Sequence, residues 1–355
     1  MAAIYYIVSF WAIFVGSFKM KDRLLQLLLA LLPLFIMMAV RVSWLPDDIN
    51  YFDFGWSSDH GRSLSEYLIV NSLGGKLEPG YWLINQLPFQ WTTVLTSLIA
   101  VSGIIIGMYN FVPQKYYSLF FFLYLYNPQF FDNIGARRFS IVVTLFIISV
   151  LLKTKGKKIL PVILMIVSGL FHNTGFLFAL FLLIPLNIAE KHFKLTIIVF
   201  SVAAAVFIVY PQLFLDTIIS QAEDSVFEHY NDYSGVSRLT VGGLLALILN
   251  MIMAAIAIIS YRKTPKDNIY SYMFLMALTY YLSRLINMST FSRISGVVML
   301  FTIVFLFSSI RRKRSWSSQV LIILTVLVTI YSYIRFLDGV PTMNGFYANY
   351  SSIFK

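Results

Sequence analysis

Long apolar segments, separated by short islands of charge, follow one another along almost the whole chain. Most are about long enough for a helix to cross the roughly 30 Å hydrocarbon core of a bilayer. Helices are expected, because every backbone N–H and C=O must be satisfied inside lipid. The roughly ten-residue alternating segments of barrel strands are not seen in the sequence. The pattern predicts an all-α polytopic membrane protein.

Composition supports this prediction and excludes several classes of site. The chain is 59% hydrophobic and 12% charged, whereas soluble domains carry about 25% charged residues. It has no cysteine, which excludes disulfides, thiolate metal sites and a cysteine nucleophile. The first apolar run has neither a basic region before it nor a small-residue cleavage site, so we expect a retained helix and not a signal peptide.

About twelve crossings are expected, in a single domain without internal repeats. The predicted crossings are 4–18, 24–40, 91–110, 116–130, 139–152, 159–171, 174–188, 195–211, 239–261, 269–286, 294–310 and 317–335. The stretch 159–188 is read as two short helices. A single broken span would place the next basic loop on the wrong side of the membrane.

The charged islands then orient the chain. Alternate loops hold seventeen basic and three acidic residues, and the other loops and the ends hold ten basic and thirteen acidic residues. By the positive-inside rule the basic loops are cytoplasmic and both termini lie outside. The net charge of +11 is therefore a topology signal, and no nucleic-acid partner is expected. The outer face carries the segments 41–90, 212–238 and 336–355.

Arginines at the outer ends of several crossings run against this charge trend. They are Arg41, Arg137, Arg138, Arg238, Arg284 and Arg293. Singly, each is explained by reaching to the interface or by pairing with an acid. As a set on one face they favour a site for an anionic lipid headgroup, such as a diphosphate, because guanidinium groups bind phosphate in a bidentate manner.

Acidic residues and one histidine are candidates for proton transfer on the same face. Asp47, Asp48 and Glu78 are possible general bases or ligands for sugar hydroxyls, the alternative being a solvated acidic loop such as that expected for Asp53, Asp59 and Glu66. His172 lies in an apolar stretch and is either a buried, satisfied histidine or a group that moves a proton or orients a phosphate. No full metal-ligand pattern occurs, and no cofactor is expected.

The order of these motifs resembles one known family. The run "NIGARRFSIVVTLFIISVLLKTKGKKILPVILMIVSGLFHNTGFLFALFLL" is similar to the central signature of EpsG-type, Wzy-like polysaccharide polymerases. Its matching positions are Arg137, Arg138, the "KTKGKK" turn, Phe171 and His172. Upstream and downstream matches are Arg41, Asp47 or Asp48, Tyr51, Glu78, Gly80, Tyr81 and Arg293. The family often has Arg-Gln where this chain has two arginines, so both remain candidates.

The resemblance implies a membrane glycosyltransferase with the helical fold of enzymes that use lipid-linked donors. Such polymerases join undecaprenyl diphosphate-linked oligosaccharide repeat units on the outer, periplasmic side of the bacterial cytoplasmic membrane. Expected partners are this lipid-linked substrate, membrane lipid, a chain-length regulator and a flippase. The expected base is Glu78, Asp48 or His172. The expected substrate-binding residues are Arg41, Asp47, Tyr51, Arg137, Arg138, Arg284 and Arg293.

Three other functions are compatible with parts of the pattern. A glycan ligase would share the arginines and differ mainly in its outer loops. A transporter or flippase would be expected to show inverted repeats and helices broken at the midplane, whereas here the polar residues gather at one face. A membrane acyltransferase using the histidine would be expected to have a more polar histidine neighbourhood.

Overall fold

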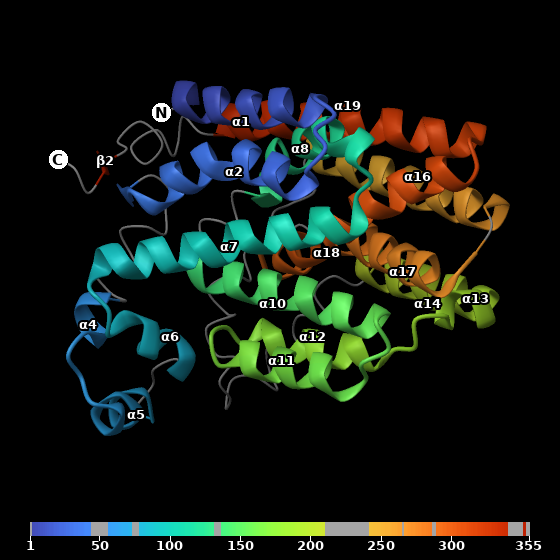
Figure 1. Ribbon diagram of the computed structural model, residues 1–355. Helices are drawn as coiled ribbons and strands as arrows, with labels where there is room; N and C mark the ends of the chain where they lie inside the picture. Colours follow the sequence, from blue (N-terminus) through green and yellow to red (C-terminus); the bar gives the residue numbers. More distant parts are fainter. Residues whose placement is uncertain are drawn as a thin grey trace. The chain divides into compact units, whose positions relative to one another are not determined.

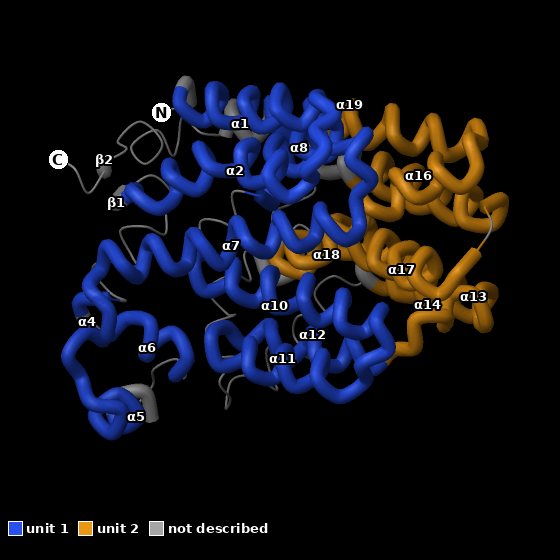
Figure 2. Tube along the Cα trace, viewed as in Figure 1, with its two compact units in different colours: residues 1–183, 330–355 blue, residues 184–329 orange. Residues whose placement is uncertain are grey.

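The computed structural model describes residues 2–43, 56–72, 78–130, 136–209, 241–264, 266–285, 289–339 and 351–352. The chain divides into two compact units, residues 1–183 with 330–355 (unit 1) and residues 184–329 (unit 2), which Figure 2 shows in blue and orange. In the described ranges the protein is helical apart from one short antiparallel strand pair. The expectation of a single membrane domain stays a prediction.

Unit 1 contains the elements that position the candidate site (Figure 1). Its helices are α1 (Ala2–Ser17), α2 (Arg23–Ala39), α4 (Ser57–Asp59), α5 (Leu64–Ser72), α6 (Pro79–Asn85), α7 (Phe89–Phe111), η2 (Gln114–Tyr116), α8 (Tyr117–Leu125), α10 (Arg137–Thr154), α11 (Ile159–Gly169) and α12 (Thr174–Leu183). The strand pair joins β1 (Arg41–Ser43) to β2 (Ser351–Ser352), with Arg41 opposite Ser352.

Helices α7 and α10 pack closely and run in the same direction. A Cβ atom on Gly103 of α7 would lie 2.4 Å from the Thr144 Oγ1 atom of α10. Glycine is therefore required for this approach. The Thr144 hydroxyl donates a hydrogen bond to the Ile99 carbonyl at 3.0 Å. The parallel direction agrees with the charge-based topology, in which both helices lead from the outer to the inner face.

Helices α11 and α12 form a tight hairpin in which small residues meet. A Cβ atom on Gly175 would lie 2.3 Å from Ser168 Oγ and 2.4 Å from the Gly169 nitrogen. The stretch 159–188 therefore contains two short helices folded back on one another, as predicted, and not one broken helix.

Unit 2 contains α13 (Ile188–Lys191), α14 (Phe193–Val209), α16 (Val241–Lys263), α17 (Asn268–Ser283), α18 (Ser289–Arg312) and most of α19 (Trp316–Gly339). The Asp267 side chain accepts the N–H of Tyr270 at 2.7 Å and so caps the start of α17. Aromatic side chains fill the unit, and the rings of Tyr261 and Phe274 stack with their centres 4.0 Å apart.

Many large apolar side chains point away from both cores. On α12 these include Phe176, Leu180 and Leu183, and on α14 Leu195 and Val202. Apolar surface of this extent is compatible with lipid and not with water. In the described ranges three helices are long and apolar enough to cross a membrane, namely Phe89–Phe111, Arg293–Arg312 and Trp316–Ile334.

A helix overlaps each of the twelve predicted crossings. Within the part of the chain that the structure describes, five further apolar helices are shorter than those three, among them Arg23–Ala39 and Ile159–Gly169. The number of twelve crossings stays a prediction, as does the likeness to the fold of lipid-donor glycosyltransferases.

Candidate functional site

Arg137 and Arg138 are the first two residues of α10, and their side chains have different surroundings. Arg137 is 1% exposed. Its Nη1 atom donates to Thr93 Oγ1 at 2.8 Å, and its guanidinium carbon lies 4.9 Å from the centre of the Phe89 ring. Both of these partners belong to α7, so Arg137 is held against that helix. The Arg138 side chain, in contrast, is 25% exposed.

Arg138 forms an ion pair with Glu78, the residue that precedes α6. The bond joins Arg138 Nη1 to Glu78 Oε2, and the Glu78 side chain is only 7% exposed. The Arg138 guanidinium carbon also lies 5.7 Å from the centre of the Tyr81 ring. A charge-assisted hydrogen bond is stronger than a neutral one, more so where water is partly excluded. The pair therefore fixes the carboxylate against a guanidinium that solvent still reaches.

A capping box starts α5 and thereby positions Tyr67. The Ser63 hydroxyl accepts the Glu66 N–H at 3.3 Å, while Glu66 Oε2 accepts the Ser63 N–H at 2.8 Å. The hydrogen bond from the Ser63 backbone lowers the pKa of Glu66, because it stabilises the charged carboxylate.

The next residue, Tyr67, connects α5 to the start of α6. Its hydroxyl accepts the backbone N–H of Glu78 at 3.0 Å, and its side chain is 4% exposed. Burial raises the pKa of Tyr67, because the charged phenolate is poorly solvated there. The backbone of Glu78 is thus anchored from α5, while its side chain is held from α10.

Gly80 ties α6 to the turn between α11 and α12. Its N–H donates to the Leu170 carbonyl at 2.9 Å. A Cβ atom at this position would lie 3.0 Å from the Phe171 ring and 3.1 Å from the Leu170 oxygen. Glycine therefore permits the close approach. The same turn carries His172, so the "EPGYW" and "GLFHNTGF" segments meet here.

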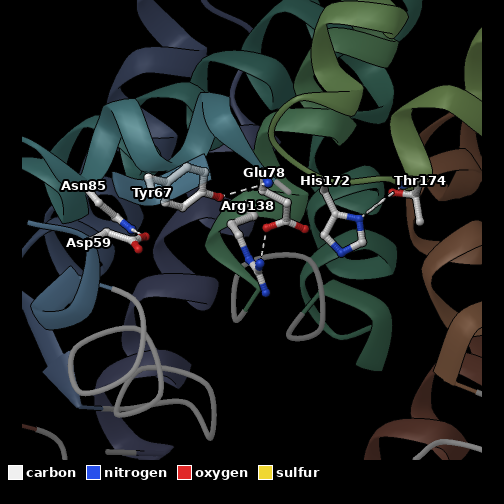
Figure 3. Close-up of polar contacts among 7 residues, drawn as sticks. All are labelled: Asp59, Tyr67, Glu78, Asn85, Arg138, His172 and Thr174. Atoms are coloured by element: carbon white, nitrogen blue, oxygen red, sulfur yellow. Dashed lines mark hydrogen bonds and ion pairs between the residues drawn. The ribbon is translucent and has the colours of Figure 1, made fainter. Parts of the chain in front are cut away.

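His172 is 6% exposed, and its ring contacts Phe139 and Thr174. The Phe139 ring, next to Arg138 in the sequence, meets it edge to face with the ring centres 5.6 Å apart. The His172 Nδ1 atom lies 3.3 Å from the Thr174 backbone nitrogen and 3.0 Å from Thr174 Oγ1. Glu78, Arg138 and His172 thus come from three separate segments that contact one another (Figure 3).

One protein-family model matches all of the segments that form this cluster. The model of the EpsG family matches residues 24–352. The chain belongs to the EpsG family. No curated protein and no solved structure matches it. The EpsG match includes every candidate residue, from Arg41 to Arg293, and confirms the predicted family.

The remaining described candidate residues of this EpsG-family chain belong to different units. Arg41 is 2% exposed and lies on β1 of unit 1. Arg284 follows α17 and Arg293 lies in the first turns of α18, and both are partly exposed residues of unit 2. Their participation in one anionic site stays a prediction.

Other predicted features lie outside the described residues. These are Asp47, Asp48, Tyr51 and the outer segment 212–238, with most of the C-terminal segment 336–355. Their predicted roles therefore stay predictions. Within the ranges that the structure does describe, no three His, Asp or Glu residues gather as metal ligands would.

A second polar group lies at the other end of α6. Asn85 Nδ2 donates to Asp59 Oδ2 at 2.9 Å, and Gln86 Nε2 donates to the Asp59 carbonyl at 2.9 Å (Figure 3 shows the first contact). Asp59 is partly exposed, and its carboxylate also fastens α4 to α6. Glu66 is exposed, as expected.

Sequence reasoning did not assign Tyr67, Thr174 or Asn85 a place in this network. One local signal existed: the spacing Ser63-x-x-Glu66 predicts a helix start at this point, directly before Tyr67. The contacts of Thr174 and Asn85 have no comparable local pattern.

Proposed function

We propose that this EpsG-family protein is a polymerase of undecaprenyl diphosphate-linked oligosaccharide repeat units. It transfers the growing glycan from its lipid diphosphate carrier to a sugar hydroxyl of a new unit. The reaction takes place on the outer face of the bacterial cytoplasmic membrane. A flippase that delivers the lipid-linked unit and a chain-length regulator are the expected protein partners.

The observation that carries this proposal is the Arg138–Glu78 ion pair beside the His172 turn. Transfer from a lipid diphosphate needs positive charge for the leaving group and a proton acceptor for the attacking hydroxyl. Arg138 supplies the positive charge and Glu78 supplies the proton acceptor, and the two side chains are in contact.

The proposed roles follow from these surroundings. Arg138 contacts the diphosphate and stabilises the charge that develops on it, because its side chain is partly exposed. Arg137 is enclosed beside α7 and supports that end of α10. Glu78 takes the proton of the acceptor hydroxyl, with Asp48 as the alternative base. Arg41, Asp47, Tyr51, Arg284 and Arg293 are proposed to bind the rest of the substrate.

The test is elongation by the purified protein in liposomes. Given a short lipid diphosphate-linked oligosaccharide and no nucleotide sugar, the protein should produce longer lipid-linked glycan. Glu78→Gln and Arg138→Gln should each reduce elongation at least about a hundredfold. The matched control is Leu83→Ala, which alters an exposed side chain of α6 and should leave elongation unchanged.

The competing functions give different products in the same assay. A ligase would move glycan to an unrelated acceptor without lengthening the lipid-linked product. A flippase would move the lipid-linked substrate between leaflets with no new glycosidic bond. Either result, without elongation, would overturn the proposal.

A further inference from the structure

Two connections of unit 2 lie side by side, one between α16 and α17 and the other between α18 and α19. Asp267, which precedes α17, forms an ion pair with Arg312 at the end of α18, although 45 positions separate the two residues. The hydroxyl oxygens of Ser260 and Ser318 lie 2.8 Å apart and join the last turns of α16 to the start of α19. The fold therefore brings both connections to one end of the unit.

Both connections carry exposed basic side chains. The first basic group is Arg262, Lys263 and Lys266, and the second is Arg311, Lys313 and Arg314. Asp267 is the only acidic residue between positions 241 and 329, and it is paired with Arg312. Glu190 on α13, which packs against α17, is accompanied by the exposed Lys191 and Lys194. Positive charge therefore exceeds negative charge at this end of the unit.

Helix ends account for only part of this positive charge. Arg262 and Arg311 lie in the last turns of α16 and α18, where a positive charge offsets the helix dipole. Lys266 and Arg314, however, lie just before the starts of α17 and α19, where the dipole disfavours a positive charge. Lys266 is held there, because its ammonium nitrogen lies 5.2 Å from the centre of the Tyr261 ring. A bound anion would offset charge that these helix starts disfavour.

Each basic group also has an exposed apolar side chain beside it. Ile269, in the first turn of α17, is 41% exposed, and Trp316, the first residue of α19, is 71% exposed. Tryptophan is enriched at the level of lipid headgroups. Clusters of roughly four to eight basic residues at the cytoplasmic ends of membrane helices attract anionic lipids, and both connections belong to the loops that the charge pattern predicts to be cytoplasmic. The combination fits a ligand that has negative charge and acyl chains.

We propose that the two basic groups together bind one phospholipid that has two phosphates, such as cardiolipin. One phosphodiester contacts the first basic group and the other contacts the second, while the acyl chains lie against Ile269 and Trp316. Because the two phosphates are linked, binding of the first raises the effective concentration of the second. A phospholipid with one phosphate occupies only one group and lacks this advantage.

The test is lipid binding to the full-length protein in detergent, measured by native mass spectrometry. Cardiolipin and phosphatidylglycerol are compared at equal phosphate concentration, and cardiolipin should bind about tenfold more tightly or better. One variant replaces the second basic group by glutamine (Arg311→Gln, Lys313→Gln and Arg314→Gln), and another replaces the first in the same way. Each should lower the affinity for cardiolipin about tenfold or more. The matched control, which removes three exposed charges from another basic loop, should keep it (Lys155→Gln, Lys157→Gln and Lys158→Gln).

Three results would overturn the proposal. Equal affinity for the two lipids would show that the two groups do not bind linked phosphates. An equal loss of affinity in the control variant would show that only the total charge matters. Displacement of cardiolipin by inorganic pyrophosphate, which has the charge without acyl chains, would show that the groups bind free anions. Circular dichroism verifies that each variant is folded, and none of these measurements depends on polymerase activity.

Discussion

The backbone N–H of Gly80 donates to the carbonyl of Leu170 at 2.9 Å, although ninety positions separate the two residues. Glu78 precedes Gly80 by two residues, and His172 follows Leu170 by two. These are the side chains that we expect to take part in the chemistry. One backbone contact therefore sets the distance between the "EPGYW" and "GLFHNTGF" segments. Changes that alter this contact should affect catalysis without touching either of the two side chains.

Gly80→Ala is the most direct change of this kind. The new Cβ would lie 3.0 Å from the Phe171 ring and 3.1 Å from the Leu170 oxygen, so α6 and the turn must separate by a few tenths of an ångström. Overpacking of this type costs about 1–3 kcal/mol. We expect elongation to fall about tenfold or more while helix content by circular dichroism is retained. Unchanged elongation would show that the spacing is not needed.

Tyr67→Phe removes the hydroxyl that accepts the Glu78 N–H. The ring remains, so the packing of Tyr67 against Trp82 is kept while the N–H loses its partner, at a cost of about 1–3 kcal/mol. The expected result is a lower kcat for elongation with little change in KM, because the proposed base is displaced and substrate contacts are not. Tyr109→Phe is the matched control, since this ring on α7 is 45% exposed. Equal kinetics for the two variants would contradict the positioning role.

The sequence predicted the helices well because their cause is local. Apolar runs of sufficient length must form helices in lipid, and a helix overlaps each predicted segment. The alternation of charge also separated α11 from α12, and the structure adds the reason for their tight turn. Gly175 meets Ser168 and Gly169 so closely that a side chain there would not fit.

The site was predicted less completely because its contacts are not local. Arg137 and Arg138 differ by one position, which turns their side chains about 100° apart on a helix. Only the location of α7 determines that Arg137 meets Thr93 while Arg138 meets Glu78. Spacing in the sequence contains no information on that choice, so both arginines were equal candidates.

Ser63→Ala tests whether the capping box of α5 supports the site. Loss of an N-cap serine costs about 1 kcal/mol, and α5 carries the Tyr67 anchor. We expect faster hydrogen exchange of the α5 amides, measured by mass spectrometry, with a modest fall in elongation. Leu68→Ala, which alters an exposed side chain of the same helix, should exchange like the unaltered protein. Equal exchange in both variants would show that the capping box does not stabilise α5.

The same box predicts a pH dependence of α5. The pKa of Glu66 is lowered from its ordinary value of 4.5 by the Ser63 hydrogen bond. A lowered carboxyl pKa stabilises the folded form above the ordinary value, and this contribution disappears as the pH falls through the lowered pKa. Protection of the α5 amides, corrected for intrinsic exchange, should therefore decrease below pH 4.5. In Glu66→Gln this decrease should be absent; a decrease of the same size would assign it to another group.

The ion pair itself predicts an unusual effect of Glu78→Gln on anion binding. Glu78 occupies the guanidinium that we expect to hold the diphosphate, so the two anions compete for Arg138. Glu78 is buried but the Arg138 side chain is 25% exposed, and a pair that water reaches from one side contributes on the order of 1 kcal/mol, which corresponds to roughly a fivefold change in affinity. Calorimetry with inorganic pyrophosphate should therefore show tighter binding by about that factor in Glu78→Gln, although the variant does not elongate glycan.

Two further variants test whether the tighter pyrophosphate binding expected in Glu78→Gln arises at Arg138. Arg138→Gln should weaken pyrophosphate binding about tenfold or more, because a charge-assisted contact is lost. Asp267→Asn breaks the Arg312–Asp267 ion pair at the start of α17, which is also partly exposed, and should leave the affinity unchanged. A gain as large in Asp267→Asn as in Glu78→Gln would mean that any released arginine binds the probe. Unchanged or weaker binding in Glu78→Gln would mean that Glu78 does not compete with the anion for Arg138.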